Sequence, residues 1–564
     1  MSSTRNSTPR TSPHAFCSTC FDFTSSPAVL SFIARASTSA SCFTRRITES
    51  LRENIRATVC MKRDEARRAL TVLSQREKVR SAPSSPRKIM QGPNETSAVR
   101  RAYDVLRKAA NERPFLDADA REELLERFIR LFVKYESDIV TAISDDFGHR
   151  VRLESMTADV MIPLDGARYA KKHVREWMQR KPVNTSPLFI PSQAFIEPVP
   201  LGVVGIISPW NYPVDLALGP SIAAFAAGNR VLLKPSELTP KVSELLAKMV
   251  AEYFQPDEFA VVQGGADVAR EVTALPLDHI LFTGSTQVGR HVARAAAENL
   301  VPTTLELGGK SPVVVHQSYN IERAASRIAI GKTFNAGQTC IAPDYALVPK
   351  AKAEAFAEHV KHALIKQHPN GEGFTTMASD RGLARMNALL EDAKAKGARV
   401  IETFKAKEGT RGFSPVVLLD VKDDMQVMQE EIFGPILPVE TYESSVDEAF
   451  ARINSRPRPL AFYYFDDDQE RIDKALHKVT SGGVVVNDTL VHFAQEELPF
   501  GGVGASGMGA YHGVKGFETF SHMRSVLQAS KASAAYNMLK PPFSGLVYKS
   551  VEVLIRGAKG LLGR

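Results

Sequence analysis

The sequence predicts an α/β protein with a parallel sheet that is covered by helices on both faces. From residue 201 onwards, short apolar runs typical of strands alternate with helical patterns. The predicted strands cover 201–207, 229–233, 259–262 and 279–282, and the predicted helices cover 215–227, 241–254 and 288–300. Strands that are apolar along nearly their whole length indicate a sheet with both faces buried. At 564 residues the chain is too long for one ordinary core, so we expect two or three domains.

Helices precede this sheet, and a ribbon separates them from it. The helical patterns cover 99–108, 117–143 and 164–180, and an apolar stripe in the second is formed by Leu124, Leu125, Phe128, Leu131 and Phe132. Residues 186–200 have prolines at both edges and predict an exposed or bridging β-hairpin. A helix at 351–366 and strands at 415–419 and 460–465 are expected to complete the second half of the protein.

The composition is that of a globular enzyme, with 44% hydrophobic and 24% charged residues. The formal charge of +8 comes largely from residues 1–91, and beyond them basic and acidic residues are mixed as on an ordinary solvated surface. We therefore expect no nucleic-acid partner. No run of eighteen apolar residues occurs, so the sequence predicts no transmembrane helix.

The front segment, residues 1–96, differs from the rest of the chain. It is rich in Ser, Thr and Arg, poor in acids, and we expect it to be disordered and to carry no chemistry. Two interpretations stay open: a mitochondrial transit peptide, or a start codon assigned too early, with Met61 or Met90 as the true start. We favour the second, and with it a cytoplasmic protein.

Four of the five cysteines, Cys17, Cys20, Cys42 and Cys60, lie in the front segment. No second Cys or His pair stands at ligand spacing from the first two, so we expect no metal site. The fifth, Cys340, lies on a loop between a predicted helix at 320–334 and a predicted strand at 345–348. It is either a reactive group on a rigid scaffold or a small buried hydrophobe. One thiol in the body of the chain suits a reducing compartment.

Other polar residues stand at the ends of predicted strands, where parallel sheets bind ligands. Gly284, Ser285 and Gly289 form a strand-to-helix turn that suits a phosphate, although a plain structural turn explains them equally well. Lys234 and Glu237 are candidates for phosphate or ribose contacts, or else for a surface lysine and a carboxylate at a helix start.

Two further residues have the chemistry of a catalytic site. Asn211, between two prolines, would donate to an oxyanion or form an Asx turn. Glu306 is a carboxylate in an apolar strand followed by glycines, and burial would raise its pKa and make it a base near neutral pH. The alternative is a salt bridge from Glu306 to Lys310.

Taken together, the motifs resemble the NAD(P)-dependent aldehyde dehydrogenase superfamily over residues 97–530. They are PWNYP, KPSE, FTGSTQVG, LELGGKSP, NAGQTC, EEIFGP and LPFGGVGASG, in this order. CIAPDY, NDTLVH and MGAYHG resemble the class 3 branch, and within it the chain is most similar to bacterial coniferyl aldehyde dehydrogenases. The front segment departs from that branch. The implied fold is a Rossmann-type cofactor domain, an α/β catalytic domain and a bridging β-ribbon.

The resemblance implies a role for each motif residue. It implies that Cys340 is the nucleophile, Glu306 the general base and Asn211 the oxyanion donor, beside the backbone N–H of Cys340. The implied NAD contacts are Lys234 and Glu237 for the adenosine ribose, Gly284, Ser285 and Gly289 for the pyrophosphate, and Glu431 and Phe433 for the nicotinamide side. NADP remains an alternative cofactor, although Glu237 would repel its 2′-phosphate.

The resemblance also implies a domain division and an assembly. The cofactor-binding domain would cover 97–306 with the hairpin 186–200, the catalytic domain 307–512, and an oligomerisation segment and tail 513–564. A homodimer is implied, in which 516–526 pairs with the ribbon of a second subunit. For the tail, whose segment 545–555 is too short and too charged to span a bilayer, we favour docking on the protein's own body over contact with a membrane surface.

The implied activity is oxidation of an aldehyde to its acid through a thiohemiacetal and a thioester on Cys340. The expected substrate is aromatic or α,β-unsaturated, with coniferaldehyde as a candidate. A medium- or long-chain fatty aldehyde is the alternative, and a non-catalytic structural relative is a remote one. Because relatives that transfer the acyl group to coenzyme A usually lack the acid at Glu306, we expect hydrolysis of the thioester.

Overall fold

The computed structural model describes residues 97–371, 373–538 and 540–562. The expectations for residues 1–96, including those for Cys17, Cys20, Cys42 and Cys60, lie outside the described residues. The described residues all belong to one compact unit, Glu95–Arg564.

The first sheet confirms the parallel sheet predicted from residue 201 onwards. Its strand order is β15-β7-β6-β3-β4-β5. The strands are β3 (Val203–Ile207), β4 (Arg230–Lys234), β5 (Phe259–Val261), β6 (His279–Thr283), β7 (Thr303–Glu306) and β15 (Gly507–Met508). Strands β3 to β7 are parallel, whereas β15 pairs antiparallel with β7. Strand β15 was not predicted, because two residues among glycines carry no periodicity.

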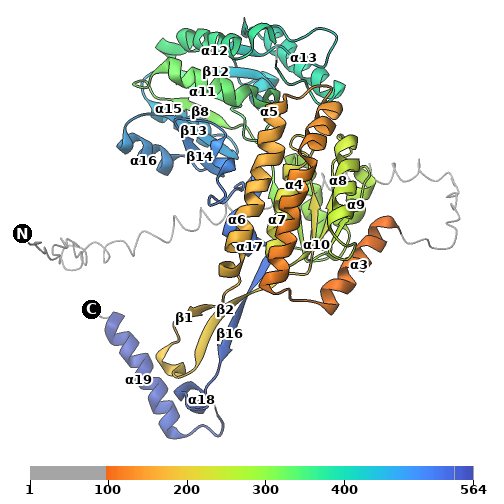
Figure 1. Ribbon diagram of the computed structural model, residues 1–564. Helices are drawn as coiled ribbons and strands as arrows, with labels where there is room; N and C mark the ends of the chain where they lie inside the picture. Colours follow the sequence, from red (N-terminus) through yellow and green to blue (C-terminus); the bar gives the residue numbers. More distant parts are fainter. Residues whose placement is uncertain (1–96, 372, 539, 563–564) are drawn as a thin grey trace, which may run out of the picture. The chain divides into compact units, whose positions relative to one another are not determined.

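Helices cover this sheet as predicted: α7 (Asp215–Ala226), α8 (Pro240–Tyr253) and α10 (Thr286–Glu298), together with the unpredicted α9 (Ala266–Thr273). Before it come α3 (Ala98–Glu112), α4 (Ala118–Phe147) and α6 (Ile162–Trp177), with the short α5 (Arg152–Ser155) between the last two. The first two begin at side-chain caps, Ser97 and Asp117. The predicted stripe of α4 is fully buried, and Phe128 packs against three other phenylalanine rings. Helices α4, α6 and α7 lie side by side (Figure 1).

A second sheet forms the other half, with strand order β10-β11-β12-β9-β8-β13-β14. Its strands are β8 (Pro312–Val315), β9 (Tyr345–Pro349), β10 (Arg399–Glu402), β11 (Val416–Leu419), β12 (Ile436–Tyr442), β13 (Ala461–Phe465) and β14 (Gly483–Val486). Its helices include α11 (Ile321–Thr333), α12 (Ala353–Gln367), α13 (Asp380–Ala395), α15 (Val446–Asn454) and α16 (Gln469–Lys478). The domain boundaries at 306 and 512 stay a prediction, although β15, which precedes residue 512, belongs to the first sheet.

The ribbon differs from the prediction in where its strands lie. Residues 186–200 are not a hairpin: Pro187–Phe189 is a 3₁₀ turn, and only β2 (Gln193–Pro200) is a strand. The second strand of the hairpin lies earlier, in β1 (Lys181–Val183), which pairs antiparallel with β2. The third strand, β16 (Ser521–Gln528), pairs with β2 of the same chain and forms an edge of the ribbon, and its expected pairing with the ribbon of a second subunit stays a prediction.

The tail forms α18 (Ala534–Met538) and α19 (Gly545–Leu562). Leu546 and Val553 on α19 are 76% and 67% exposed, so the expected docking on the protein's own body is wrong for these side chains. Among the described helices, none has the length and apolar character needed to cross a membrane.

Candidate active site

Most of the predicted site residues line one cavity of about 510 Å³, at the carboxyl ends of β3, β6 and β7. These residues are Asn211, Gly284, Ser285, Glu306, Cys340, Glu431 and Phe433. Lys234, Glu237 and Gly289 do not line it. The cavity is thus where a parallel sheet places its ligand.

The loop that carries Cys340 is built by an abrupt end of α11. Asn335, Ala336 and Gly337 all adopt positive φ, from 51° to 71°, so the helix cannot continue. The buried Gln338 fixes the loop: its amide nitrogen donates to the carbonyls of Asn335 and Thr376, and its amide oxygen accepts from the N–H of Ala378. Three hydrogen bonds from one side chain hold the segment before Cys340 in one conformation.

Asn211 contacts this loop directly. Its side-chain amide donates to the carbonyl of Gln338 over 3.1 Å, and its own carbonyl accepts from Asn335. The backbone N–H groups of Cys340 and Ile341 also lie beside the thiol, where they lower its pKa. The Asn211 amide has a second N–H, and the two backbone N–H groups lie beside the sulfur. Donors of this kind would stabilise an oxyanion formed on Cys340.

The surroundings of the Cys340 thiol favour its protonated form. Burial raises its pKa, and the carboxyl groups of Glu431 and Glu306 raise it further, which outweighs the two backbone donors. Only the thiolate attacks. Before the reaction, therefore, a base must take the proton or a bound cation must stabilise the thiolate.

Glu306, at the end of β7, is one such base, and it lines the same cavity as Cys340. It is 2% exposed, and neither of its carboxylate oxygens has a hydrogen-bond partner within the described part of the chain. Burial raises its pKa well above the ordinary value for glutamate. The alternative salt bridge is wrong, because the ammonium group of Lys310 binds Asp344 and the carbonyls of Val427 and Glu430 instead.

The other side of the cavity has the features of a dinucleotide site. Ser285 caps α10 by accepting from the N–H of Val288, and the start of this helix lies at the cavity, which Ser285 and Gln287 line. Gly289, one turn later, permits close packing, since a Cβ there would lie 2.6 Å from the Leu307 side chain. It therefore acts through the contact between helix and strand and does not line the cavity.

Glu431 and Phe433 complete this side. One oxygen of Glu431 is buried without a partner among the described residues, and burial, assisted by Asp344, raises its pKa to about 8. A Cβ at Gly308 would collide with this carboxyl, so glycine leaves room for the group. The ring of Phe433 lies 5.5 Å from that of Trp210. These features fit a dinucleotide. Glu431 could accept from ribose hydroxyls, the start of α10 suits a phosphate, and Phe433 offers a wall for a flat ring.

Lys234 and Glu237 lie apart from the cavity lining, at the end of β4. The ammonium nitrogen of Lys234 lies 2.6 Å from a Glu237 oxygen, and Lys234 is 3% exposed against 47% for Glu237. Although burial acts against ionisation of Glu237, the bond from Lys234 leaves its pKa lowered, so Glu237 is a charged hydrogen-bond acceptor.

An aromatic group next to the loop of Cys340 was not predicted from the sequence: the hydroxyl of Tyr212 hydrogen-bonds to that of Thr339, the residue before Cys340. Tyr212 stacks on Phe334, and Leu216 and Phe493 pack with them, next to the cavity wall. Tyr463 donates to the carbonyl of Ile341, beside the nucleophile. Tyr212 belongs to the motif PWNYP, and Tyr511 and His512 belong to MGAYHG. The motifs therefore contained these residues, but the sequence did not show that the fold brings them near the Cys340 loop.

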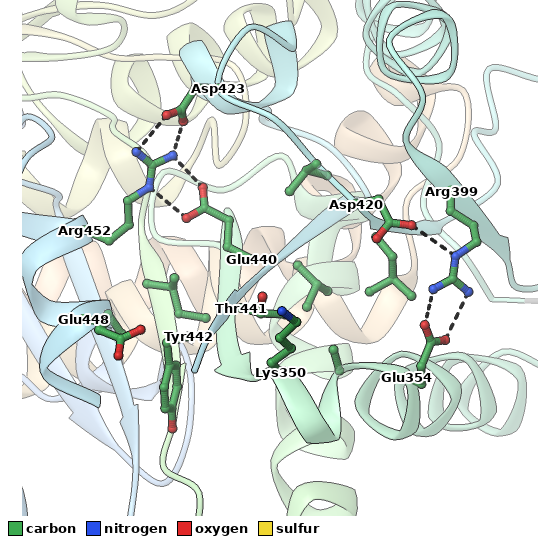
Figure 2. Close-up of a pocket in the computed structure, with 16 residues that line it drawn as sticks. Lys350, Glu354, Arg399, Asp420, Asp423, Glu440, Thr441, Tyr442, Glu448 and Arg452 are labelled. Carbon is green, nitrogen blue, oxygen red and sulfur yellow. Dashed lines mark hydrogen bonds and ion pairs between the residues drawn. The ribbon is translucent and has the colours of Figure 1, made fainter. Parts of the chain in front are cut away.

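A second cavity, of about 590 Å³, lies over β9, β11 and β12, and most of its charged groups pair with one another (Figure 2). Arg452 pairs with Glu440 and Asp423, and Arg399 pairs with Glu354 and Asp420. None of the predicted catalytic residues lines it.

The comparisons with known proteins agree with this geometry. The sequence profile of the aldehyde dehydrogenase family matches residues 74–526, so the chain belongs to the aldehyde dehydrogenase family. It is 45% identical over 469 residues to the probable coniferyl aldehyde dehydrogenase of Pseudomonas aeruginosa, covering 83% of this chain and 98% of that protein.

Two solved structures are similar as well. The substrate-bound aldehyde dehydrogenase of Staphylococcus aureus matches with a TM-score of 0.77 and 36% identity, over 82% of this chain and all of that one. Aldehyde dehydrogenase C of Pseudomonas syringae, with NAD⁺ and octanal, matches with a TM-score of 0.69 and 27% identity, over 77% and 89%. The chain is an NAD(P)-dependent enzyme that oxidises an aldehyde to the carboxylic acid.

Proposed function

We propose that the substrate is an aromatic or α,β-unsaturated aldehyde of the coniferaldehyde type, and that Cys340, Glu306 and Asn211 carry the chemistry. The observation that supports the substrate class is the aromatic group around Tyr212, whose hydroxyl hydrogen-bonds to that of Thr339, the residue before Cys340. The similarity to the coniferyl aldehyde dehydrogenase of Pseudomonas aeruginosa supports the same class.

In the first step, the Cys340 thiolate attacks the aldehyde carbon and gives a thiohemiacetal oxyanion. The Asn211 amide and the N–H of Cys340 would donate to that oxygen, and losing one such donor costs about 10²–10³-fold in rate. Bound NAD⁺ supplies the hydride acceptor. Glu306 then takes a proton from water, which attacks the Cys340 thioester and releases the acid.

A planar conjugated substrate suits the side chains beside Cys340. Phe334 and Phe493 are partly exposed where they pack on the buried Tyr212, so part of each ring would be available to a flat substrate. Stacked or edge-on aromatic pairs add about 0.5–1.5 kcal/mol beyond the area that they bury.

Two histidines support a polar group on that ring. His492 has no partner on either ring nitrogen, and His512, which is 8% exposed, has none on Nδ1, counting the described residues. Burial lowers the pKa of His492 to about 4 and that of His512 to about 3, so both are neutral at pH 7 and able to donate and accept. A phenol or methoxy group would satisfy them, whereas an alkyl chain would not.

A medium-chain aldehyde is the second candidate, because the similar Pseudomonas syringae structure contains octanal. The test is NADH formation by the full chain with coniferaldehyde, cinnamaldehyde and decanal, with Cys340→Ala as the inactive control. We expect a kcat/KM for coniferaldehyde about 2- to 10-fold above that for cinnamaldehyde, which corresponds to one added hydrogen bond. Preference for decanal would reject the substrate class.

The role of the histidines is tested separately. His492→Phe should remove the advantage of coniferaldehyde over cinnamaldehyde, and His477→Phe, which changes an exposed histidine on α16, should keep it. His512 is left unchanged because its φ of 81° disfavours most other side chains. An unchanged ratio in His492→Phe would reject the polar contact.

The form of the enzyme in the cell is also proposed. We infer a cytoplasmic homodimer, supported by the single thiol of the body of the chain and by the exposed edge of the ribbon formed by β1, β2 and β16. Light scattering on the purified chain measures the assembly, and a monomeric mass would reject it.

A further inference from the structure

A basic cavity lies at the opposite end of the first sheet from Cys340. Its volume is about 280 Å³, and its lining comes from the end of α3 and from the segments that lead into β3 and β4. Arg107, Arg113 and Arg230 line it together with Asn111, and no acidic side chain of the described residues does. The catalytic residues lie at the carboxyl ends of these strands, so this cavity is separate from the active site.

Two of the arginines have their charge neutralised by carboxylates outside the cavity. Arg107 pairs with Asp278 over 2.7 Å, and its other nitrogens donate to Tyr103 and to the carbonyl of Pro276. Arg113 pairs with Asp257 over 2.8 Å.

Arg230 has no such carboxylate within the described part of the structure. It is 2% exposed, its Nε has no hydrogen-bond partner there, and its guanidinium makes a long 3.5 Å contact to the carbonyl of Arg113. The nearby Asp257 and Glu258 are engaged with Arg113 and Arg127. A buried guanidinium without a counter-ion is costly, and burial together with the charge of Arg113 lowers the pKa of Arg230.

A second buried arginine stands behind the cavity. Arg121 is 3% exposed and donates to the carbonyls of Leu116 and Ala226, and a Cβ at Gly228, in the cavity wall, would lie 2.8 Å from its guanidinium carbon. Burial lowers the pKa of Arg121 to about 10. Glycine at 228 therefore leaves the approach to this second positive charge open.

We propose that this cavity binds a small phosphate-type oxyanion, with the buried Arg230 as the central ligand and Asn111 and Arg113 at the entrance. A guanidinium donates two parallel hydrogen bonds to a phosphate, which matches the unpartnered Nε of Arg230. The bound anion joins α3 to the starts of β3 and β4. Its expected effect is stabilisation of the cofactor-binding half, not a change in the chemical step.

Isothermal titration calorimetry of the full chain, with NAD⁺ present to fill the cofactor cavity, tests the proposal. The probes are inorganic phosphate, pyrophosphate and glycerol 3-phosphate, against chloride at matched ionic strength. We expect one site per chain and a higher thermal midpoint in the presence of the anion. Binding of phosphate and pyrophosphate alone would identify a free phosphate ion, and tighter binding of glycerol 3-phosphate would identify a phosphomonoester.

Matched variants locate the site. Arg230→Met should weaken binding at least tenfold, and Arg323→Met, which removes an exposed arginine on α11, should not. Asn111→Asp places a carboxylate at the exposed entrance with little risk to folding, and it should abolish phosphate binding while raising the thermal midpoint. Heat no greater than with chloride, or equal binding by Asn111→Asp and the native chain, would overturn the proposal.

Discussion

Replacing Glu306 by glutamine separates the two chemical steps. Both oxygens of Glu306 are buried and unpartnered, so glutamine, which has the same shape, breaks no hydrogen bond or ion pair of the described residues. If Glu306 acts on the deacylating water, Cys340 should still acquire its thioester and release one equivalent of NADH. Steady-state turnover should then fall by about 10²–10⁴-fold, the usual contribution of a general base.

Stopped-flow fluorescence of NADH measures both quantities in one trace. We expect a burst close to one NADH per active site followed by a slow steady state. The matched control is Glu430→Gln, which changes a more exposed neighbouring glutamate that pairs with Arg385. A lost burst would place Glu306 in the activation of Cys340, and an unchanged kcat would refute any role as base.

The same substitution has a pH-dependent effect on stability. The unfolded chain loses the Glu306 proton near pH 4.3, about the value for a free glutamate. The folded chain holds that proton to a much higher pH, because burial raises the pKa. As the pH rises above about 4.3, the native chain therefore loses stability relative to Glu306→Gln. Thermal midpoints at pH 5 and pH 8 should show a gap that widens with pH, and a constant gap would contradict the unpartnered burial.

Three further substitutions test other residues. Asn211→Ala should lower kcat/KM by about 10²–10³-fold, and a smaller loss at an unchanged thermal midpoint would remove Asn211 from the oxyanion site. Glu237→Gln should raise the ratio of kcat/KM for NADP⁺ to that for NAD⁺, because it removes a negative charge that repels a 2′-phosphate; an unchanged ratio rejects this contact. Phe128→Ala should cost about 3–5 kcal/mol of unfolding free energy in urea titrations, since the ring is fully buried among Phe225, Phe254 and Phe259. A loss below about 1 kcal/mol would mean that the helices repack around the vacated space.

Elements with a local signal could be predicted from the amino-acid order. Continuous apolar strands specify β3, β4 and β6, and the stripe of α4 specifies its buried face, because side-chain burial follows the periodicity of the backbone. The position of Cys340 on a loop was predicted in the same way, from the end of a helical pattern at Asn335 to Gly337. That Asn211 and Glu306 serve one site was implied by the resemblance of their motifs, and both line the same cavity.

The partner of each polar group, in contrast, depends on the packed chain. Glu306 lacks an ion pair among the described residues because Lys310 is held by Asp344, and this depends on segments far apart in the sequence. Likewise, β16 pairs with β2 although more than three hundred residues separate them in the sequence. Arg230 lacks a carboxylate partner in the described part of the chain because Asp257 and Glu258 pair with Arg113 and Arg127, which only the structure shows. Burial and pairing arise from tertiary contacts. They determine the pKa of a group and the free-energy cost of its charge, and neither can be read from the position of the group in the sequence.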